Sequence, residues 1–247
     1  MTDQIAPDRF DAVLFDLDGV LTSTARIHSR CWKAMFDDFL ERRAGEGKEP
    51  FRPFDIETDY KLYVDGKPRY EGVKSFLASR HISLPEGTPA DPPAAVTVCG
   101  LGNRKDELVK AAIDRGEVEA YPGSVALVRR VREHGIRTAV VSSSNNCREV
   151  LRAADIESLF DVRVDGLVST EFHLAGKPAP DTFLKAAQML GVSPARAVVV
   201  EDALAGVESG RAGGFGLVIG VDRGGSREAL RAHGADVVVT DLGELLS

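Results

Sequence analysis

The chain has 247 residues, 43% of them hydrophobic and 28% charged, which is typical of a globular protein with one large domain or two modest ones. Its net charge of −7 gives no general basic face for nucleic acid and no polybasic patch for an anionic membrane. We therefore expect no nucleic-acid partner and no membrane partner.

The cysteine usage and the N-terminal sequence predict a location. Cys31, Cys99 and Cys147 are odd in number and widely spaced, which indicates reduced thiols rather than a disulfide framework. The first residues lack the basic start and apolar core of a signal peptide, and no apolar run approaches the ~20 residues of a membrane span. We expect a cytoplasmic protein.

The first strong pattern lies near the N-terminus, where an apolar run ends in Asp16 and Asp18, followed by Gly19. Side chains at positions i and i+2 of a strand point to the same side, so the two carboxylates converge at the strand's carboxyl end. A buried carboxylate pair costs free energy unless a metal ion or a reaction uses it. The sequence therefore predicts a functional acidic pair at this strand end, with Gly19 allowing the backbone to turn away at once.

The next block, residues 22–118, has a different pattern. The expected elements are a helix over residues 24–43, a break over 44–50, a helix over 71–79, an irregular loop over 84–93 and a helix over 105–115. The block is too long for a connection and is not strongly strand-like. We expect a mostly helical cap domain over residues 22–118, inserted into a core formed by residues 1–21 and 119–247.

From residue 121 onward, helices alternate with short apolar strands. The expected helices cover residues 124–134, 147–154, 181–190, 203–212 and 226–233, and the expected strands cover 138–141, 160–164, 197–200, 215–219 and 237–239. This alternation is typical of a parallel sheet covered on both faces, with the carboxyl ends of all strands along one ligand-binding edge. The fold class is therefore α/β, a doubly wound parallel-sheet core with an inserted helical cap domain.

The residues that carry chemistry gather at that edge. They are Asp16 and Asp18, Ser142, the pair Glu201 and Asp202, and Lys177 on a loop before a helix. Four acids exceed what one lysine neutralises, so a cation is implied, and an all-oxygen donor set suits Mg²⁺. Residues 142–146 precede a helix and offer donors for an anion. Together these groups indicate phosphoryl transfer.

Four ordered motifs resemble those of the haloacid dehalogenase (HAD) superfamily of phosphotransferases, which has a Rossmann-like core. They are residues 16–22, 140–142, 176–178 and 200–202. The resemblance implies that Asp16 is a nucleophile that forms an aspartyl-phosphate, and that Asp18 is the general acid/base.

The same resemblance implies the remaining core roles. Mg²⁺ would be held by the Asp16 carboxylate, the Asp18 carbonyl and Asp202, with Glu201 nearby. Ser142 and Lys177 would hold the transferring phosphate.

Residues 18–32, 142–146 and 177–181 also resemble the β-phosphoglucomutase-like subgroup of that superfamily. The resemblance implies that Ser144 and Asn146 donate to phosphate from the core side. It implies that cap cations hold the second phosphate of a sugar bisphosphate, and the positions that match best are Arg69 and Lys105. His28, on the first cap helix of the resembling segment, is a further candidate for substrate binding. The chain departs from the subgroup at Asn145, where a lysine is common, and in a longer cap.

This resemblance implies an Mg²⁺-dependent mutase that interconverts β-glucose 1-phosphate and glucose 6-phosphate through β-glucose 1,6-bisphosphate. Its partner would be a small phosphorylated sugar, and the protein would be a monomer or a weak homo-oligomer. The first alternative is a HAD phosphatase that hydrolyses a small phosphorylated metabolite such as a sugar phosphate. In that reaction, water attacks the same aspartyl-phosphate. The second is a non-enzymatic, receiver-like phosphate sensor, although receivers lack a hundred-residue cap and need no second acid two residues on.

Overall fold

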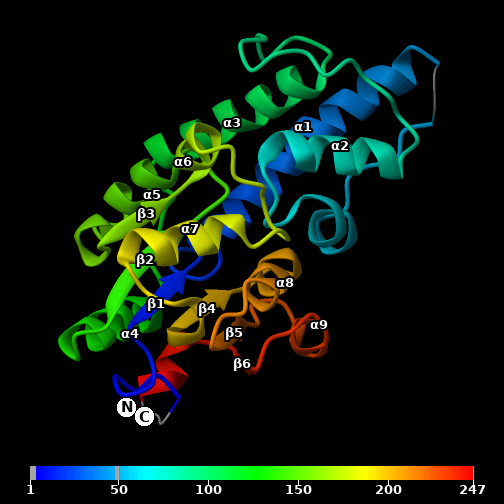
Figure 1. The fold of residues 1–247 in the computed structure, drawn as a ribbon. Coiled ribbons are helices and arrows are strands. Elements are labelled where there is room, and N and C mark those ends of the chain that lie inside the picture. The colour runs from blue at the N-terminus through cyan, green and yellow to red at the C-terminus, as the bar shows by residue number, and fades with distance from the viewer. Residues whose placement is uncertain (1–3, 48–49, 247) are drawn as a thin grey trace. The chain divides into compact units, whose positions relative to one another are not determined.

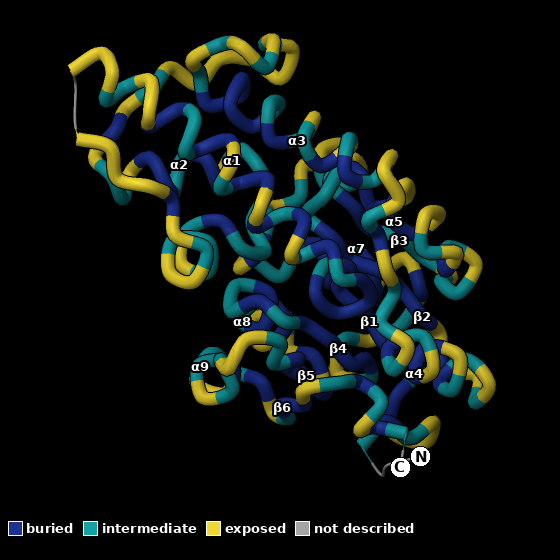
Figure 2. The backbone as a smooth tube through the Cα atoms, turned by 180° about the vertical axis from the view of Figure 1, so that it is seen from behind, coloured by how far each residue is buried: buried dark blue, intermediate teal, exposed yellow. Residues whose placement is uncertain are grey.

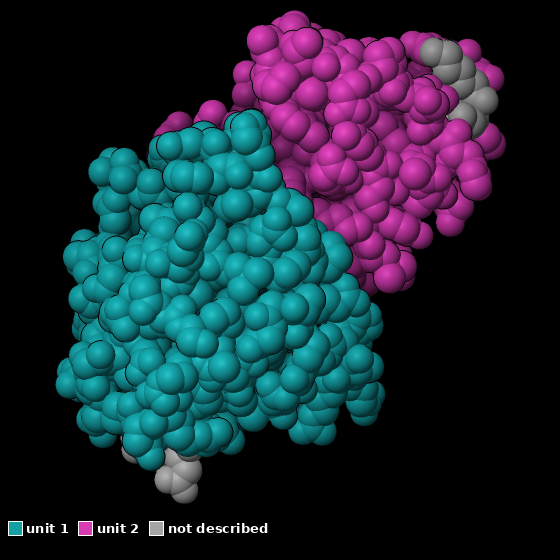
Figure 3. Space-filling model, in the orientation of Figure 1, with its two compact units in different colours: residues 1–24, 118–247 teal, residues 25–117 magenta. Residues whose placement is uncertain are grey.

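A computed structural model describes residues 4–47 and 50–246 and divides the chain into two compact units (Figure 3). Unit 1 comprises residues 1–24 and 118–247, and unit 2 comprises residues 25–117. Residues 48–49, inside the expected break after the first cap helix, lie outside the described residues. The same holds for the outermost ends of the two expected core segments, residues 1–3 and 247.

Unit 1 is built on a parallel sheet, which in the described residues has six strands in the order β3-β2-β1-β4-β5-β6 (Figure 1). The strands are β1 Ala12–Phe15, β2 Arg137–Val141, β3 Val162–Val164, β4 Ala197–Glu201, β5 Leu217–Val221 and β6 Val237–Val239. Every pair of neighbouring strands is parallel. This is the order of a doubly wound fold whose topological switch point lies between β1 and β4. The predicted fold class is confirmed.

Helices cover this sheet. They are α4 Pro122–Glu133, α5 Cys147–Ala153, α6 Gly166–Glu171, α7 Asp181–Leu190, α8 Leu204–Ala212 and α9 Arg227–Ala232. One hydrophobic cluster packs Phe183 of α7 and Val207 of α8 against Leu14 and Val199 of the sheet. Helix α4 packs on β2 and on the 3₁₀ turn Leu242–Leu246. Figure 2 shows the strands as the buried centre of unit 1, as expected for a parallel sheet with apolar residues on both faces.

Several elements of unit 1 differ from the sequence prediction: the strand expected over residues 160–164, for example, is observed over Val162–Val164, and the helix expected over 124–134 over Pro122–Glu133. The strand expected over residues 215–219 begins at Leu217, because the amide of Gly216 is bonded to the carbonyls of Pro194 and Ala197 before the ladder with β4 starts. Helix α6 was not predicted, because its single short turn-and-a-half gives too little periodicity to detect.

Unit 2 is helical. Its elements are α1 Thr24–Gly45, which begins at the last residue of unit 1, a π-helix over Ile56–Val64, α2 Arg69–Ser79 and α3 Val98–Asp114. Aromatic rings form the centre of its core: Trp32 and Phe54 stack on Phe36, and Phe76 is tilted against Phe36. Helix α3 begins well before the expected residue 105, because the Thr97 hydroxyl accepts a hydrogen bond from a first-turn amide at 2.9 Å. Among the described residues, none of the helices has both the length and the apolar character needed to cross a membrane.

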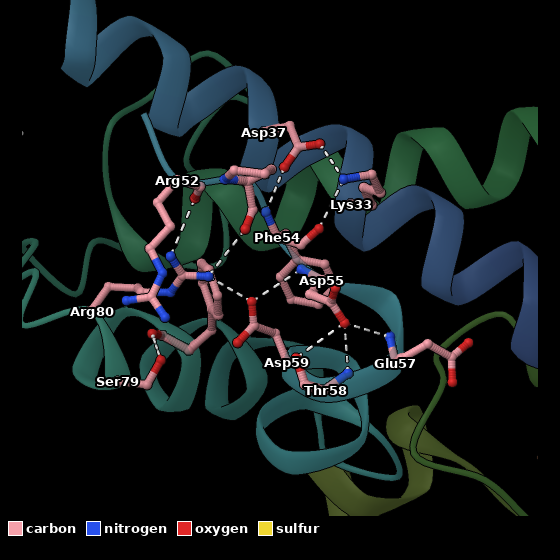
Figure 4. A network of polar contacts seen from close by, with 12 residues as sticks. Lys33, Asp37, Arg52, Phe54, Asp55, Glu57, Thr58, Asp59, Ser79 and Arg80 are labelled. Carbon is pink, nitrogen blue, oxygen red and sulfur yellow. Dashed lines mark hydrogen bonds and ion pairs between the residues drawn. The ribbon is translucent and has the colours of Figure 1, made fainter. Parts of the chain in front are cut away.

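The π-helix is held by polar side chains around it (Figure 4). Asp55 caps its first turn by accepting from two backbone amides, at 2.8 Å each. Arg80, directly after α2, donates to Asp59 at 2.6 Å, and Asp37 of α1 accepts from the amide of Phe54 at 2.7 Å. Long π-helices are rare, and no apolar periodicity announced this one in the sequence.

The chain passes between the two units twice, and the residues of unit 1 at these crossings are bonded to each other. The amide of Ser23 donates to the carbonyl of Glu119 at 2.8 Å, and the amide of Tyr121 donates to the carbonyl of Leu21 at 2.9 Å. Thr22 forms an antiparallel bridge in the same ribbon. The outgoing and returning segments are therefore one two-stranded ribbon rather than two independent linkers.

Candidate active site

Asp16 directly follows β1 and marks the centre of the site. Its amide donates to the carbonyl of Val200 at 2.9 Å, which extends the β1–β4 ladder by one residue. Glu201 and Asp202 at the end of β4 therefore lie beside Asp16, although they are far from it in the sequence. The Asp16 side chain is buried, with 7% of the residue exposed, at the switch point where doubly wound folds bind ligands.

Lys177 joins the two strand ends electrostatically. It is 3% exposed, and its Nζ donates to Asp16 Oδ1 and to Glu201 Oε1, at 2.5 Å each. Burial alone lowers the pKa of a lysine, but the two carboxylates outweigh burial and raise the pKa of Lys177. Burial raises the pKa of Asp16 well above its ordinary value; Lys177 opposes this rise, whereas Glu201 and Asp18 add to it. Lys177 thus provides the charge that keeps Asp16 ionisable.

Glu201 is fully buried and its two oxygens are both occupied. Oε1 faces Lys177, while Oε2 accepts from the backbone amides of Asp202 and Ala203 at 2.9 and 3.0 Å. Gly206 of α8 makes room for this carboxylate, since a Cβ at that position would lie 1.8 Å from Oε1. Sequence reasoning missed Gly206, although a glycine inside a helical pattern is a signal of close approach. Glu201 is placed to fix Lys177 and the turn that carries Asp202.

Asp16, Glu201 and Asp202 offer carboxylate oxygens that lie within 4.8 Å of one another. Such an all-oxygen, partly buried set fits a hard divalent cation such as Mg²⁺. Gly19 packs against this set: it has a left-handed φ of +84°, and a Cβ there would lie 1.8 Å from Asp202 Oδ2. Both the backbone conformation and the close approach require glycine at this turn.

Asp18 is oriented by two buried hydroxyls. The Thr24 hydroxyl donates to Asp18 Oδ1, and the Thr22 hydroxyl lies 2.6 Å from that of Thr24. The Thr22 hydroxyl also donates to the carbonyl of Leu17, at 3.2 Å. Thr22 lies in the motif over residues 16–22 and Thr24 in the segment over residues 18–32, but the contacts of their hydroxyls depend on the turn that brings them back to Asp18.

Ser142 follows β2, and its amide donates to the carbonyl of Val164 at 2.9 Å. The hydroxyl of Ser142 accepts from the amide of Ser144, and that of Ser144 accepts from the amide of Asn146, at 3.1 Å each. These bonds shape the loop before α5. A hydroxyl that accepts from an amide keeps its own hydrogen as a donor.

The three predicted cap residues all lie in unit 2, on different helices. Lys105 of α3 is 6% exposed; its Nζ lies 2.6 Å from Nδ1 of His28 on α1 and 4.9 Å from the ring centre of Trp32. An ammonium group only donates, so Nδ1 of His28 accepts and its proton resides on Nε2. Arg69 of α2 pairs instead with Asp106, at 2.9 Å.

This fold and these strand ends define a class of phosphoryl-transfer enzymes, and comparison with known proteins agrees. The model of the haloacid dehalogenase-like hydrolase family matches residues 10–214, and the chain belongs to this family. It is therefore a HAD-family enzyme. A β-phosphoglucomutase from Mycobacterium bovis is 52% identical over 243 residues, which are 97% of this chain and 93% of that one. The predicted resemblance to the family and to this subgroup is confirmed.

Two further known proteins are similar to this chain. A trehalose-phosphate phosphatase from Mycobacterium leprae is 42% identical over 127 residues, which are 50% of this chain but 28% of that protein. The crystal structure of β-phosphoglucomutase from Clostridium difficile superposes with a TM-score of 0.74 at 24% identity, covering 96% of this chain and 93% of that one. The latter likeness concerns the fold.

Proposed function

We propose that the protein is an Mg²⁺-dependent phosphomutase that interconverts β-glucose 1-phosphate and glucose 6-phosphate through an aspartyl-phosphate on Asp16. The observation that carries the phosphoryl transfer is the contact of Lys177 with both Asp16 and Glu201 beside Asp202. The similarity to a β-phosphoglucomutase over nearly the whole chain, unit 2 included, supports the mutase reaction.

In the first half-reaction, a carboxylate oxygen of Asp16 attacks the phosphorus atom of a bisphosphate, and the bond from phosphorus to the sugar oxygen breaks. In the second, a hydroxyl of an incoming β-glucose 1-phosphate attacks the aspartyl-phosphate, the bond from phosphorus to the Asp16 oxygen breaks, and the Asp16 carboxylate is regenerated. The bisphosphate formed in this step then reorients, so that its other phosphate faces Asp16 in the next cycle. Mg²⁺, held by Asp16, Asp202 and the carbonyl of Asp18, would offset the negative charge of the transferring group. Ser142 and Lys177 bind the oxygens of the transferring phosphoryl group, and Ser144 and Asn146 donate hydrogen bonds to phosphate from the same side.

Asp18 moves the proton. It gives a proton to the departing sugar oxygen and takes one from the attacking hydroxyl, so the proton count returns to its start after both half-reactions. The hydrogen bond from Thr24 orients the Asp18 carboxyl group.

Unit 2 acts as the cap in this proposal. Lys105, Arg69 and His28 supply the positive charge and the donor for the second phosphate of the sugar bisphosphate, and water is excluded while the intermediate reorients. Asn145, where a lysine is common in the subgroup, removes one charge from the core side. That substitution favours a second candidate function, a phosphatase in which water replaces the sugar hydroxyl.

One experiment separates the two. β-Glucose 1-phosphate is supplied with Mg²⁺ and a trace of β-glucose 1,6-bisphosphate, and glucose 6-phosphate and inorganic phosphate are measured together. Faster formation of glucose 6-phosphate supports the mutase, whereas equal or greater release of phosphate rejects it and leaves the Asp16 chemistry in place.

The nucleophile is tested with Asp16→Asn, which should abolish both products. Asp11→Asn is the matched control, because Asp11 lies just before β1 and pairs with Arg196 at 2.7 Å, at the opposite end of the strand. Unchanged turnover in Asp16→Asn would reject the enzymatic assignment of this residue.

A further inference from the structure

Arg223, in the loop between β5 and α9, contacts three separate segments of unit 1. Its Nε donates to the carbonyl of Gly19 at 3.0 Å, and one terminal nitrogen donates to the carbonyl of Thr240 at 2.9 Å. The same nitrogen lies 3.3 Å from Asp241 Oδ2, and the guanidinium carbon lies 3.8 Å from the ring centre of Tyr121. The side chain is 23% exposed, so these contacts are largely shielded from water. None of the roles assigned above uses this arginine.

Two of these segments lie at the site or in the ribbon next to it. Gly19 is the residue directly after Asp18, and its Cα faces the carboxylate of Asp202 so closely that a side chain cannot fit. Tyr121 belongs to the returning strand of the ribbon, where its amide is bonded to Leu21. Arg223 therefore touches the catalytic turn at Gly19 and the returning strand of the ribbon at Tyr121.

The third segment is a firm anchor. Asp241 Oδ1 accepts from the amide of Gly243 at 2.8 Å, and Gly123 at the start of α4 packs so tightly on it that a Cβ there would lie 1.9 Å away. Asp241 is thus held in place by contacts that do not involve Arg223. The planar guanidinium can hold two carbonyls in set directions while stacking on a ring, which an ammonium cannot do.

We propose that Arg223 is a positioning residue that fixes the turn at Gly19 and, through that turn, the placement of Asp18 and Asp202. The proposal deepens the proposed function and rests on its assignment of Asp18 and Asp202, but it does not depend on which sugar phosphate is the substrate. Without Arg223 the turn at Gly19 is less restrained, so the side chains of Asp18 and Asp202 no longer keep fixed positions.

The test compares Arg223→Ala and Arg223→Lys with Arg227→Ala. Arg227 is the matched control, because it also donates to a carbonyl near the C-terminus, that of Val238 at 2.6 Å, and is partly buried like Arg223. Three properties are measured: deuterium uptake of peptides that contain residues 19–23 and 119–121, calorimetric binding of Mg²⁺ alone, and kcat and KM for hydrolysis of acetyl phosphate.

In Arg223→Ala we expect deuterium uptake in both ribbon peptides to quicken by about 10-fold, because their cross-strand amides open more often. We expect kcat to fall about 10-fold with KM changed less than about 3-fold, and Mg²⁺ to bind about 5-fold more weakly, since a small misplacement of reacting groups suffices for such losses. Arg223→Lys should recover part of each loss, and Arg227→Ala should match the wild type.

Wild-type deuterium exchange and kcat in Arg223→Ala would overturn the proposal. Equal losses in Arg227→Ala would also overturn it, because they would show that Arg223 contributes only to the general packing of the C-terminal segment. If Arg223→Ala does not fold, Arg223→Lys decides, and wild-type values there overturn the proposal. Failure of the mutase assignment is visible separately, because it is read from glucose 6-phosphate in the wild type and not from metal binding, exchange or acetyl phosphate.

Discussion

Lys177→Met tests the electrostatic balance of the site most directly. The ammonium group makes 2.5 Å contacts with Asp16 and Glu201, and all three side chains are at most 9% exposed. Methionine retains most of the volume, so the change removes charge rather than packing. Removing one partner of a buried ionic group leaves the remaining charges buried without compensation. We therefore expect the free energy of unfolding near pH 8 to fall by about 3–5 kcal/mol.

The loss should depend on pH in a defined direction. Lys177 opposes the rise in the pKa of Asp16, so without it that pKa rises further above the value of the unfolded chain. A carboxyl group with a raised folded-state pKa destabilises the folded state increasingly as the pH rises from about 4, the unfolded value, through the raised pKa. The deficit relative to wild type should therefore shrink on going from about pH 8 to about pH 5.

Guanidinium unfolding followed by circular dichroism, with Mg²⁺ removed by chelation, measures this deficit. Lys185→Met is the control, because its ammonium lies over the ring of Phe172 at 3.7 Å on a partly exposed surface, and its loss should cost less than about 1 kcal/mol. A deficit in Lys177→Met below about 1 kcal/mol, or one that is the same at both pH values, would refute the reasoning.

Three further substitutions probe the close contacts of the site. Gly19→Ala should weaken calorimetric binding of Mg²⁺ and remove most turnover, because its Cβ would overlap a carboxylate oxygen at 1.8 Å; Gly214→Ala, which has a similar left-handed φ of +67° and open space, should cost only about 1 kcal/mol in thermal unfolding and leave Mg²⁺ binding intact. Gly206→Ala should lower kcat by displacing Glu201 even though alanine favours the helix by about 1 kcal/mol. Gly210→Ala is the control in the same helix, because its Cβ would meet Val199 at 3.1 Å rather than a carboxylate, and an equal fall in kcat in both variants would contradict this. Thr24→Val should lower kcat about 10-fold because Asp18 loses its donor, and Thr24→Ser should restore it; wild-type kcat in the valine variant would count against the orienting role.

The sheet and its functional edge could be predicted because they depend on local patterns. Short apolar runs such as Ala197–Glu201 identify buried parallel strands, and parallel strands bring their carboxyl ends to one edge. That rule places Asp16, Ser142 and Glu201 at one edge, whereas the neighbouring positions of β1 and β4, and with them the bond from Asp16 to Val200, come from the structure. Helix α7 even begins and ends at the predicted residues, since Gly191 adopts the left-handed conformation that terminates it.

The remaining features depend on partners distant in the sequence. Arg223 has no pattern that predicts its contact with Gly19, because the two residues are 204 positions apart in the sequence. The π-helix likewise depends on Arg80, directly after α2, and on Asp37 of α1. Such side-chain contacts are settled by tertiary packing and override weak local preference.

The position of β1 also has a consequence for folding kinetics. This strand lies between β2 and β4, yet the inserted unit separates it from β2 in the sequence, so joining them closes a loop of ~120 residues at an entropic cost of about 4 kcal/mol. Within unit 2, Arg30 near the start of α1 pairs with Glu117 at the unit's other end. If unit 2 folds first, it brings its two ends together and turns a long loop closure into a short one. Substitutions that unfold unit 2 should therefore slow the assembly of the sheet, which stopped-flow refolding would detect as a lower folding rate.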